Sequence, residues 1–474
     1  MEISNMKTLE SALEFRQENI STIFDLEHLD TLAKESGFIQ RKSNRIEAVD
    51  FVQLMTVEII QDPLISLDGL CDILATLNEN SRMSAQGLQQ RINTSGAANF
   101  LSSVVCVCFT DAVAPIFALT PPTLMAPFRR VLIQDSTTIT VHEKLAEPFR
   151  GCGGSGAKAA LKLHFVYDFH RHQFTTVTVT DGATPETAMG QALMDMIQPS
   201  DLLLRDLGYF SLEQLKQIEQ KEAYFLSRLP KSCGVYFDNS PESQAFDIAR
   251  YIDSHYPHQA VVDLQVYLGE EKFPCRLVAY RLPWSVVNER RRKAYQNARK
   301  KSRKPTKEYL SWLCFSFYVT NVPLNIWATE VIGTIYRLRW QIELIFKQTK
   351  SLLHIDCILG TSPYRVECII YGRLCVVCLI SMLYSTLFWY AWEMNLGEVS
   401  RDKLIKWLLR QNRLTQLIRD SSLFWFFDEL LSLLPKQLLK QKRKRKTTLE
   451  RIVDLETFEQ AFSNHAEEIL QKAA

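Results

Sequence analysis

The sequence predicts an α/β protein whose mixed sheet is flanked by helices. Three observations lead to this prediction. Short β-rich runs alternate with helical patterns over residues 121–230, an order typical of a sheet covered by helices. Residues 231–311 interrupt this alternation with β-rich runs of their own, and strand character returns at Trp312–Thr320. Both ends of the chain show the helical spacing of apolar residues.

The composition indicates sizeable cores and little net charge. Apolar residues make up 46% of the 474 residues, enough for two to four domains, and the formal net charge is only +2. Any nucleic-acid surface must therefore come from local clusters. Arg290–Lys307 contains ten Lys or Arg, and Lys436–Lys446 contains seven. A solvated helix or tail is the alternative interpretation of such runs.

Eleven cysteines are spread along the chain without the spacing of a disulfide framework. This distribution favours free thiols in a reducing compartment. The pair Cys375-x-x-Cys378 has only Val, Leu and Ile beside it, so core cysteines are favoured over a metal or redox pair. Four cysteines in apolar segments are expected to be buried: Cys106, Cys108, Cys375 and Cys378.

The N-terminal region, residues 1–120, is predicted to be helical. It could bind DNA, or it could be a dimerisation or packing module, and the sequence does not separate these roles. Its first thirty residues contain no apolar run of the kind found in a secretory signal. Leu374–Trp392 is nineteen residues without a charge, close to the length of a membrane span. A buried core helix is favoured, because nothing else in the chain looks membranous.

The first part of the predicted core, residues 121–230, contains two strands in which an apolar run is followed by an acid. Val131–Ile139 carries V-L-I-Q before Asp135, and Asp201–Tyr209 carries L-L-L-R before Asp206. The remaining predicted elements are a hairpin, two helices and a strand: Leu161–Asp168 with Phe174–Thr180, Pro185–Ile197, Ser211–Glu222 and Ala223–Leu229.

The interrupting segment, residues 231–311, is predicted as a β-rich insertion. Its strands are expected at Gln259–Tyr267 and Phe273–Leu282, and a basic helix is expected at Ser285–Lys304. The second part of the core, residues 312–395, then follows.

Two long helices are predicted in the second part of the core, at Ile335–Lys350 and Arg365–Met394. A helical C-terminal region, residues 396–474, completes the chain, with dimerisation as one candidate role.

The helix Ile335–Lys350 has an unusual polar face. At about 100° per residue, one acid, three cations and a phenol fall along one stripe: Tyr336, Arg339, Glu343, Lys347 and Lys350. The opposite side is apolar and is expected to be buried: Leu338, Ile342, Ile345 and Leu352. A lone carboxylate among cations suits a divalent metal held by the acid, with phosphates held by Arg and Lys.

Three acids, Asp135, Asp206 and Glu343, could converge from two strand ends and this helix. Hard oxygen ligands suit Mg²⁺ or Mn²⁺. Two such ions about 4 Å apart can activate a water or a 3′-hydroxyl and stabilise the leaving oxygen of a phosphodiester. For any single aspartate, a turn or capping role is the alternative.

Two other motifs do not indicate sites. Gly151–Lys158 lacks the G-K-[S/T] ending of a phosphate-binding loop, so a flexible loop is favoured. The three histidines of the predicted hairpin lack a matching set of Cys or His ligands, so surface or core histidines are favoured over a metal site: His164, His170 and His172.

The run Tyr336-x2-Arg339-x3-Glu343-x6-Lys350 resembles the Y-(2)-R-(3)-E-(6)-K signature of the DDE transposases of bacterial insertion sequences, in the insertion-sequence-four family. Val131–Thr138 resembles the first acidic motif of that family, and Asp206–Tyr209 resembles the second. Gly151–Phe165 and Thr320-Asn321 also look familial, and the resemblance spans roughly residues 10–400.

This resemblance implies an RNase H-like catalytic core interrupted by the insertion. It implies that Asp135, Asp206 and Glu343 are the catalytic residues and hold the metal, Mg²⁺ or Mn²⁺, as two ions. Tyr336, Arg339 and Lys350 would grip phosphates of the transposon end.

Further DNA contacts are expected around the same site. Lys347 is an open candidate on the polar stripe, and the arginines of the basic helix would neutralise phosphates: Arg290, Arg291 and Arg292. A flipped base would need an aromatic platform, for which Trp312, Phe315, Phe317 and the more distant Trp284 are candidates. This step belongs to a DNA-hairpin pathway, which is a hypothesis.

The predicted function is that of a transposase of a bacterial insertion sequence. Such a protein binds the element ends and target DNA, acts as a homodimer in the synaptic complex, and catalyses metal-dependent nicking and strand transfer by a cut-and-paste route. We expect it in the cytoplasm with the nucleoid, without a membrane partner. A catalytically inactive DNA-binding repressor is the alternative, against which the intact acids argue, and a membrane-associated protein is a third hypothesis.

Overall fold

The computed structural model describes residues 9–40, 46–79, 81, 83–112, 124–153, 156–410, 412–420, 423–441, 450–452 and 454. The chain divides into two compact units. Unit 1 comprises Met1–Leu119, Ser136–Thr184 and Ile342–Arg443, and unit 2 comprises Thr120–Asp135, Pro185–Gln341 and Lys444–Ala474. The basic residues 442–446 lie outside the described residues, so any role of the second basic run stays a prediction.

One nine-stranded sheet has the order β3-β2-β1-β4-β5-β9-β8-β7-β6. β1 is parallel to β4, and β4 is parallel to β5, whereas β2/β3 and the pairs β5/β9, β9/β8, β8/β7 and β7/β6 are antiparallel. The predicted fold class, a mixed sheet flanked by helices, is confirmed. The strands are β1 (Arg130–Thr140), β2 (Ala160–Asp168), β3 (Gln173–Asp181), β4 (Asp201–Arg205), β5 (Tyr224–Arg228), β6 (Val235–Tyr236), β7 (Val261–Leu268), β8 (Phe273–Arg281) and β9 (Phe315–Thr320).

In unit 2, β4 is buried along its whole length. Its leucines are shielded from water on both sides of the sheet, as is typical of a parallel strand covered on both faces. α8 (Glu186–Ala192) precedes β4 in the sequence and α9 (Leu212–Gln220) follows it. α9 begins where Ser211 Oγ accepts a hydrogen bond from Gln214 N, the usual N-cap arrangement.

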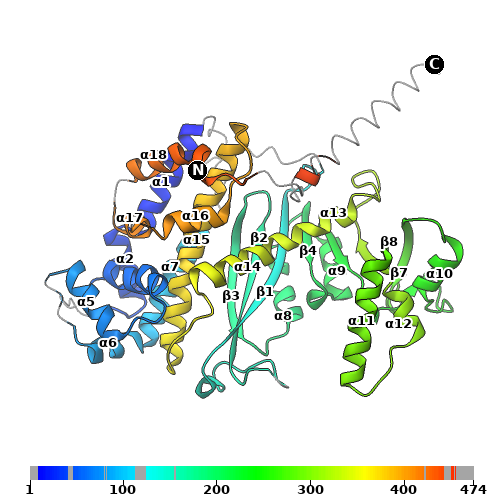
Figure 1. The fold of residues 1–474 in the computed structure, drawn as a ribbon, viewed down its shortest axis with the longest axis horizontal. Helices are drawn as coiled ribbons and strands as arrows, with labels where there is room; N and C mark the ends of the chain where they lie inside the picture. Colours follow the sequence, from blue (N-terminus) through cyan, green and yellow to red (C-terminus); the bar gives the residue numbers. More distant parts are fainter. Residues whose placement is uncertain are drawn as a thin grey trace. The chain divides into compact units, whose positions relative to one another are not determined.

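The insertion extends the same sheet instead of forming a separate one. β6, β7 and β8 continue the sheet beyond β9, and α10 (Ile248–His255), α11 (Trp284–Lys300) and α12 (Lys307–Trp312) accompany them (Figure 1). α11 is the predicted basic helix. The strand predicted from Trp312 begins only at Phe315, because α12 occupies Trp312.

Unit 1 is built around α15 (Pro363–Glu393), which packs against α7, α1 and β3. By length and composition α15 could cross a membrane, as could the bent pair of α6 and α7, but 89% of the most apolar window of α15 is buried. α15 is therefore the buried core helix that was favoured for Leu374–Trp392. The other helices of this unit are α1 (Leu9–Ile23), α2 (Leu26–Glu35), α3 (Ala48–Gln53), α4 (Ile59–Gln61), α5 (Leu67–Leu77), α6 (Ala85–Ile92), α7 (Ser95–Ala112), α16 (Arg401–Leu408), α17 (Arg413–Arg419) and α18 (Phe424–Leu433).

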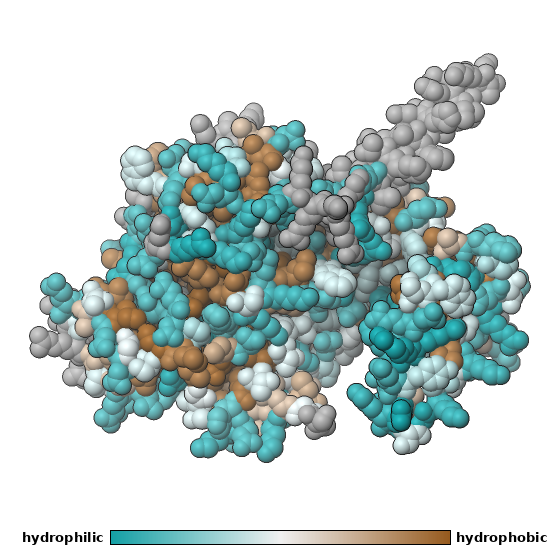
Figure 2. Space-filling view, viewed as in Figure 1, coloured by the Kyte–Doolittle hydropathy of each residue, from teal (hydrophilic) through white to brown (hydrophobic). Residues whose placement is uncertain are grey.

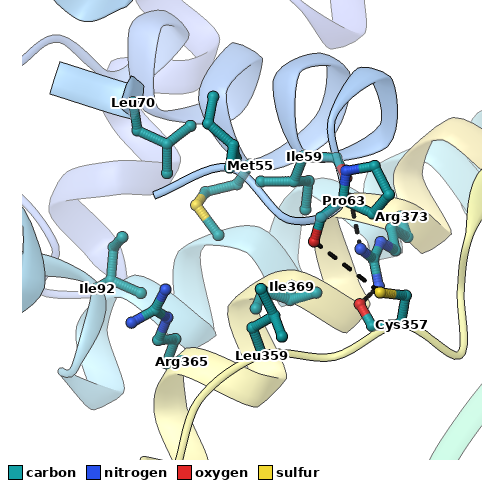
Figure 3. Close-up of a pocket in the computed structure, with 11 residues that line it drawn as sticks. Met55, Ile59, Pro63, Leu70, Ile92, Cys357, Leu359, Arg365, Ile369 and Arg373 are labelled. Atoms are coloured by element: carbon teal, nitrogen blue, oxygen red, sulfur yellow. Dashed lines mark hydrogen bonds between the residues drawn. The ribbon is translucent and has the colours of Figure 1, made fainter. Parts of the chain in front are cut away.

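α15 comes unusually close to the π-helical segment Leu54–Glu58. A Cβ atom built on Gly372 would lie 1.6 Å from Met55 O, so only glycine fits there. Beside this contact lies a cavity of about 20 Å³, where Arg373 donates to Cys357 O at 2.6 Å (Figure 3). A cavity of this size holds about one water molecule, so it is not a ligand site.

The cysteines are free thiols, and most of the predicted burial is correct. Cys108, Cys375 and Cys378 are buried, and burial raises the pKa of the Cys378 thiol well above its ordinary value. The prediction for Cys106 is wrong, because its side chain is exposed. It lies two residues from Cys108, about 200° around α7, and therefore on the opposite face.

The three histidines of the β2–β3 hairpin are buried core residues. His172 packs its ring 3.6 Å from the Phe388 ring of α15, measured between centroids, and its Nδ1 lies 3.2 Å from Tyr167 Oη. Arg401 Nη2 donates to His172 O at 3.2 Å. Burial, together with the nearby Arg401 charge, lowers the pKa of His172 well below its ordinary value.

Candidate active site

Asp135 and Asp206 occupy matching positions on neighbouring strands. Gln134 of β1 pairs with Arg205 of β4 in the parallel register, so the next residue on each strand is an aspartate at the same level of the sheet. Adjacent strands lie about 4.8 Å apart. Both aspartates are half-buried. The register therefore places the two aspartates at neighbouring positions within unit 2. The sequence predicted that both follow the end of a strand, but only Asp206 does, because β1 continues to Thr140 beyond Asp135.

The end of β4 is fixed by the buried side chain of Arg205. Its Nη1 donates to Gln214 Oε1 at 2.9 Å and its Nη2 donates to Gly190 O at 3.2 Å. Burial lowers the pKa of Arg205 to about 10, so the side chain remains charged at neutral pH. Because these bonds hold β4 against α8 and α9, the backbone at Asp206 is fixed in position.

The helix predicted over Ile335–Lys350 is interrupted. α13 (Ile332–Tyr336) is followed by a 3-10 turn, Arg337–Arg339, and then by α14 (Trp340–Leu353). Within the predicted apolar side, Leu338, Ile342 and Ile345 are buried and Leu352 is half-buried.

The tighter winding of the 3-10 turn changes the predicted polar stripe. Residues three apart in a 3-10 turn lie above one another. Tyr336 is not on an exposed stripe as predicted, because it is only 7% exposed and packs its ring 5.0 Å from that of Tyr318. Tyr336 is buried because it contacts residues of the sheet.

Tyr336 contacts the end of β4, and Arg339 contacts Asp135 in the middle of β1. Tyr336 Oη donates to Arg205 O at 3.2 Å and lies 3.4 Å from Asp206 Oδ1. Arg339 Nη1 donates to Asp135 Oδ2 at 2.8 Å, and both side chains are 14% exposed. Burial, with the Asp206 charge beside it, raises the pKa of Tyr336, so the phenol remains a donor at neutral pH. One short segment thus holds both aspartates.

The remaining signature residues belong to unit 1. Glu343 is half-buried in the first turn of α14, four residues after Arg339. Lys350 Nζ donates to Thr138 O in the second half of β1 at 3.2 Å, and Lys347 is exposed. The structure therefore brings Asp135, Asp206, Tyr336 and Arg339 together, and it places the other three on the following helix.

The chemistry of these donors fits a divalent metal. Asp135, Asp206 and Glu343 offer carboxylate oxygens, which hard cations such as Mg²⁺ and Mn²⁺ prefer. A positive group already faces Asp135, since the Arg339 guanidinium pairs with it. Across the part of the chain that the structure describes, no three Asp, Glu, His or Cys side chains are close enough together to hold an ion.

The predicted DNA contacts on α11 divide into two kinds. Arg290 donates to Phe315 O at 2.9 Å and thus holds α11 against β9, whereas Arg291 donates to Leu310 O at 3.2 Å and holds α11 against α12. Arg292 is exposed. The side of the insertion that Figure 2 shows is largely hydrophilic.

The aromatic candidates differ in how far their rings are exposed to solvent. Trp312 is half-buried and packs its ring 4.2 Å from that of Phe317. Phe315 and Phe317 are buried. Trp284, at the start of α11, is 69% exposed and has the Arg291 guanidinium 5.8 Å from its ring centroid. Trp284 is therefore the most exposed ring of this set.

One face of the N-terminal region is unsuited to a DNA backbone. An open cleft of about 1060 Å³ in unit 1 is lined by residues from α1, α2 and α17. Carboxylates predominate among its charged residues and would repel phosphates: Asp25, Glu27, Glu35, Glu47 and Asp420. DNA binding by the N-terminal helices would require another face.

Sequence reasoning missed the residues that hold α13. Tyr280 of β8 contacts Gly333 and Thr329, and Arg276 of the same strand is buried and contacts Trp327 O. The sequence pattern that could have identified them is a pair of polar residues, four apart, in an otherwise apolar strand. Side chains alternate along a strand, so such residues share one face.

Comparison with known proteins identifies the family of the chain. A family model described as the transposase DDE domain matches residues 126–379. The chain is 33% identical over 374 residues to the transposase for insertion sequence element IS231D of Bacillus thuringiensis subsp. finitimus, covering 76% of this chain and 77% of that protein. It is 26% identical over 408 residues to the transposase for insertion sequence element IS1151 of Clostridium perfringens, covering 82% and 85%.

Among solved structures, a chain of the cryo-EM structure of the piggyBac transposase synaptic complex with hairpin DNA is similar, with a TM-score of 0.43 and 10% identity. The likeness covers 90% of this chain and 86% of that chain. The matched range includes Asp135, Asp206 and the whole of Tyr336–Lys350. On the strength of that domain and of its relatives among the insertion sequences, this chain belongs to the DDE transposase family.

Proposed function

We propose that this chain is the transposase of a bacterial insertion sequence that binds the element ends and catalyses metal-dependent nicking and strand transfer. The observation that carries the proposal is the pair of aspartates on β1 and β4, each contacted by a residue of one short segment. Two adjacent carboxylates held in place by a phenol and a guanidinium are a costly arrangement in a merely structural role, because like charges side by side repel.

In this proposal Asp135, Asp206 and Glu343 hold Mg²⁺ or Mn²⁺, as two ions. When bound, the metal would activate the attacking water or 3′-hydroxyl and stabilise the leaving oxygen. Tyr336 fixes the end of β4 through Arg205 O. Arg339 neutralises and orients Asp135, and with Lys350 it would grip phosphates at the transposon end.

The DNA surface would continue over α11. Arg292 is proposed as a direct phosphate contact, and Lys347 as a second one on α14. Arg290 and Arg291 support the helix that presents Arg292. If a hairpin intermediate forms, Trp284 is favoured over Trp312 as the platform for a flipped base, because its ring is exposed.

Two further proposals follow from the same function. Cutting two ends in one complex suits a homodimer, with the C-terminal helices as candidate contacts. The DNA substrate places the protein in the cytoplasm with the nucleoid.

The deciding experiment measures nicking of DNA that carries the ends of the element, with Mg²⁺ or Mn²⁺, by the wild type and by Glu343→Gln. We expect the variant to lose nicking and to keep end binding. Glu213→Gln is the matched control, since Glu213 is an exposed glutamate on α9, and it should nick like the wild type. Equal nicking by Glu343→Gln would overturn the site assignment.

A second candidate function is repression by a chain that binds ends without cutting them. The arginine already facing Asp135 favours this candidate more than any other feature does, since it satisfies a carboxylate without a metal. A wild-type protein that binds the ends tightly and nicks with neither metal would select this function.

A further inference from the structure

The linker from β9 to α13 is held by one face of β8. Arg276 and Tyr280 lie four residues apart on this strand and therefore point to the same side of the sheet. Arg276 is 3% exposed, and its Nη1 donates to Val322 O at 3.2 Å and to Trp327 O at 2.8 Å. The buried Arg276 guanidinium thus binds two carbonyl groups of the linker, and all of these residues belong to unit 2.

A carboxylate on the neighbouring strand completes this first attachment. Asp263 Oδ2 of β7 accepts hydrogen bonds from Arg276 Nη2 at 2.6 Å and from Thr329 Oγ1 at 2.7 Å. Side chains from β8 and from the linker therefore converge on one carboxylate oxygen of β7. The position of Thr329 is set by the insertion, four residues before Gly333.

Tyr280 makes the second attachment, directly at the start of α13. Its Oη donates to Thr329 O at 2.7 Å and accepts from Gly333 N at 2.9 Å. Backbone N–H groups in the first turn of a helix have no partner within the helix, so the phenol satisfies one of them. A Cβ atom on Gly333 would lie 3.0 Å from the Tyr280 ring, which shows how closely the ring and this backbone approach.

Packing between aromatic rings also connects Tyr280 to the site. It meets Tyr318 of β9 edge-on at 5.7 Å, and Tyr318 packs 5.0 Å from Tyr336. α13 is five residues long, too short to be stable without tertiary contacts. Its location therefore depends on its attachments, and the one that Tyr280 makes is at Gly333, only three residues before Tyr336.

We propose that Tyr280 is a positioning residue of the active site, which fixes α13 through Gly333 and thereby holds Tyr336 and Arg339 against Asp206 and Asp135. The proposal rests on the proposed function for its effect on cleavage. A displacement of about 1 Å at a catalytic centre can cost on the order of 100-fold in rate. The insertion therefore has a role besides carrying α11: its strand β8 aligns the residues that hold the two aspartates.

The test uses the full-length chain and the variant Tyr280→Phe, which keeps the ring and removes the hydroxyl. Tyr364→Phe is the control, because Tyr364 lies on α15 and is 41% exposed. Three quantities are measured: amide hydrogen exchange over residues 332–339, the affinity for element ends, and the nicking rate at saturating DNA across Mg²⁺ concentrations.

We expect Tyr280→Phe to exchange the amides of residues 332–339 at least tenfold faster and to bind the ends within twofold of the wild type. Its nicking rate should fall at least tenfold, with a higher Mg²⁺ concentration for half-maximal rate. Gly333→Ala, which presses a methyl group against the same ring, should give the same pattern. A purely structural role would instead lower binding and nicking together through loss of folded protein.

Unchanged exchange in Tyr280→Phe would overturn the proposal, and so would faster exchange with a wild-type nicking rate. The exchange measurement does not depend on activity. If the wild type never nicks, the proposed function fails, whereas accelerated exchange confined to residues 332–339 would still support the positioning of α13 by Tyr280.

Discussion

Arg339 Nη1 donates to Asp135 Oδ2 at 2.8 Å, so the arginine of the signature directly contacts the carboxylate of the first acidic motif. Both side chains are 14% exposed, and water therefore screens the pair only weakly. Removing one member of such a pair leaves the other charge partly buried without its partner. This pair gives the most direct test of how the site is assembled.

The first prediction is a double-mutant cycle on that pair. Arg339→Ala and Asp135→Asn should each lower the free energy of unfolding by about 1–3 kcal/mol. The double variant should lose less than the sum, by a coupling of about 0.5–3 kcal/mol. Denaturant unfolding of the four proteins measures this coupling, and simple additivity would contradict a direct interaction.

A second prediction concerns the salt dependence of DNA binding. Arg292→Ala should reduce the slope of log K against log salt concentration by about 0.9, because one phosphate contact is lost. Arg291→Ala should mainly lower the free energy of unfolding, since Arg291 donates to Leu310 O inside the insertion. Titrations at several salt concentrations separate the two, and equal slopes for Arg292→Ala and the wild type would remove Arg292 from the DNA surface.

Acid should destabilise unit 1 through His172. Because burial lowers the pKa of His172 in the folded state, the unfolded chain binds a proton first as the pH falls below about 6.5. The free energy of unfolding should therefore be lost progressively below that pH, with a slope of at most about 1.4 kcal/mol per pH unit for this one group. His164, whose pKa burial lowers to about 4, adds a loss of the same sign.

His172→Phe keeps an aromatic ring beside Phe388 and removes the titrating group. Its unfolding free energy should vary less between pH 6.5 and 5 than that of the wild type, measured by denaturant unfolding at each pH. The buried Asp168 acts in the opposite direction, because burial raises its pKa, and this contribution should be common to both proteins. Parallel pH profiles for the two proteins would count against His172.

The last prediction concerns the contact between α15 and Met55 O. Gly372→Ala should destabilise unit 1 by about 3 kcal/mol or more, because the new methyl group would lie 1.6 Å from that oxygen and the two elements must separate. Gly87→Ala in α6 is the control, with its nearest neighbour at 3.4 Å. It should be neutral or slightly stabilising, because alanine favours a helix more than glycine does. Thermal unfolding of both variants distinguishes packing from helix propensity.

The sequence was sufficient to predict the class of fold and the adjacency of two acids. In both β1 and β4 a short apolar run comes before an aspartate, and the parallel register brings these two positions to one level. The continuation of β1 beyond Asp135 was not predicted. The buried character of α15 was also predictable from nineteen residues without a charge. These features depend on local patterns, which a single sequence contains.

The features that could not be predicted depend on contacts between residues that lie far apart in the sequence. The burial of Tyr336 depends on Arg205 O and Tyr318, which lie far from it in the sequence. The intramolecular roles of Arg290 and Arg291 depend on carbonyl groups of β9 and of α12. Helical periodicity identifies the face of a helix, but it does not show whether a cation on that face has a partner within the protein.

The 3-10 turn between α13 and α14 has a consequence for insertions and deletions. Tyr336 and Arg339 are separated by three residues, the repeat of a 3-10 turn, and Arg339 and Glu343 by four, close to one α-helical turn. Adding or deleting one residue within Arg337–Arg339 would rotate everything after it by about 100° relative to everything before it. Substitutions within the turn can be absorbed, but changes in its length cannot. The distances between the signature residues along the chain are therefore more constrained than the identity of the residues between them.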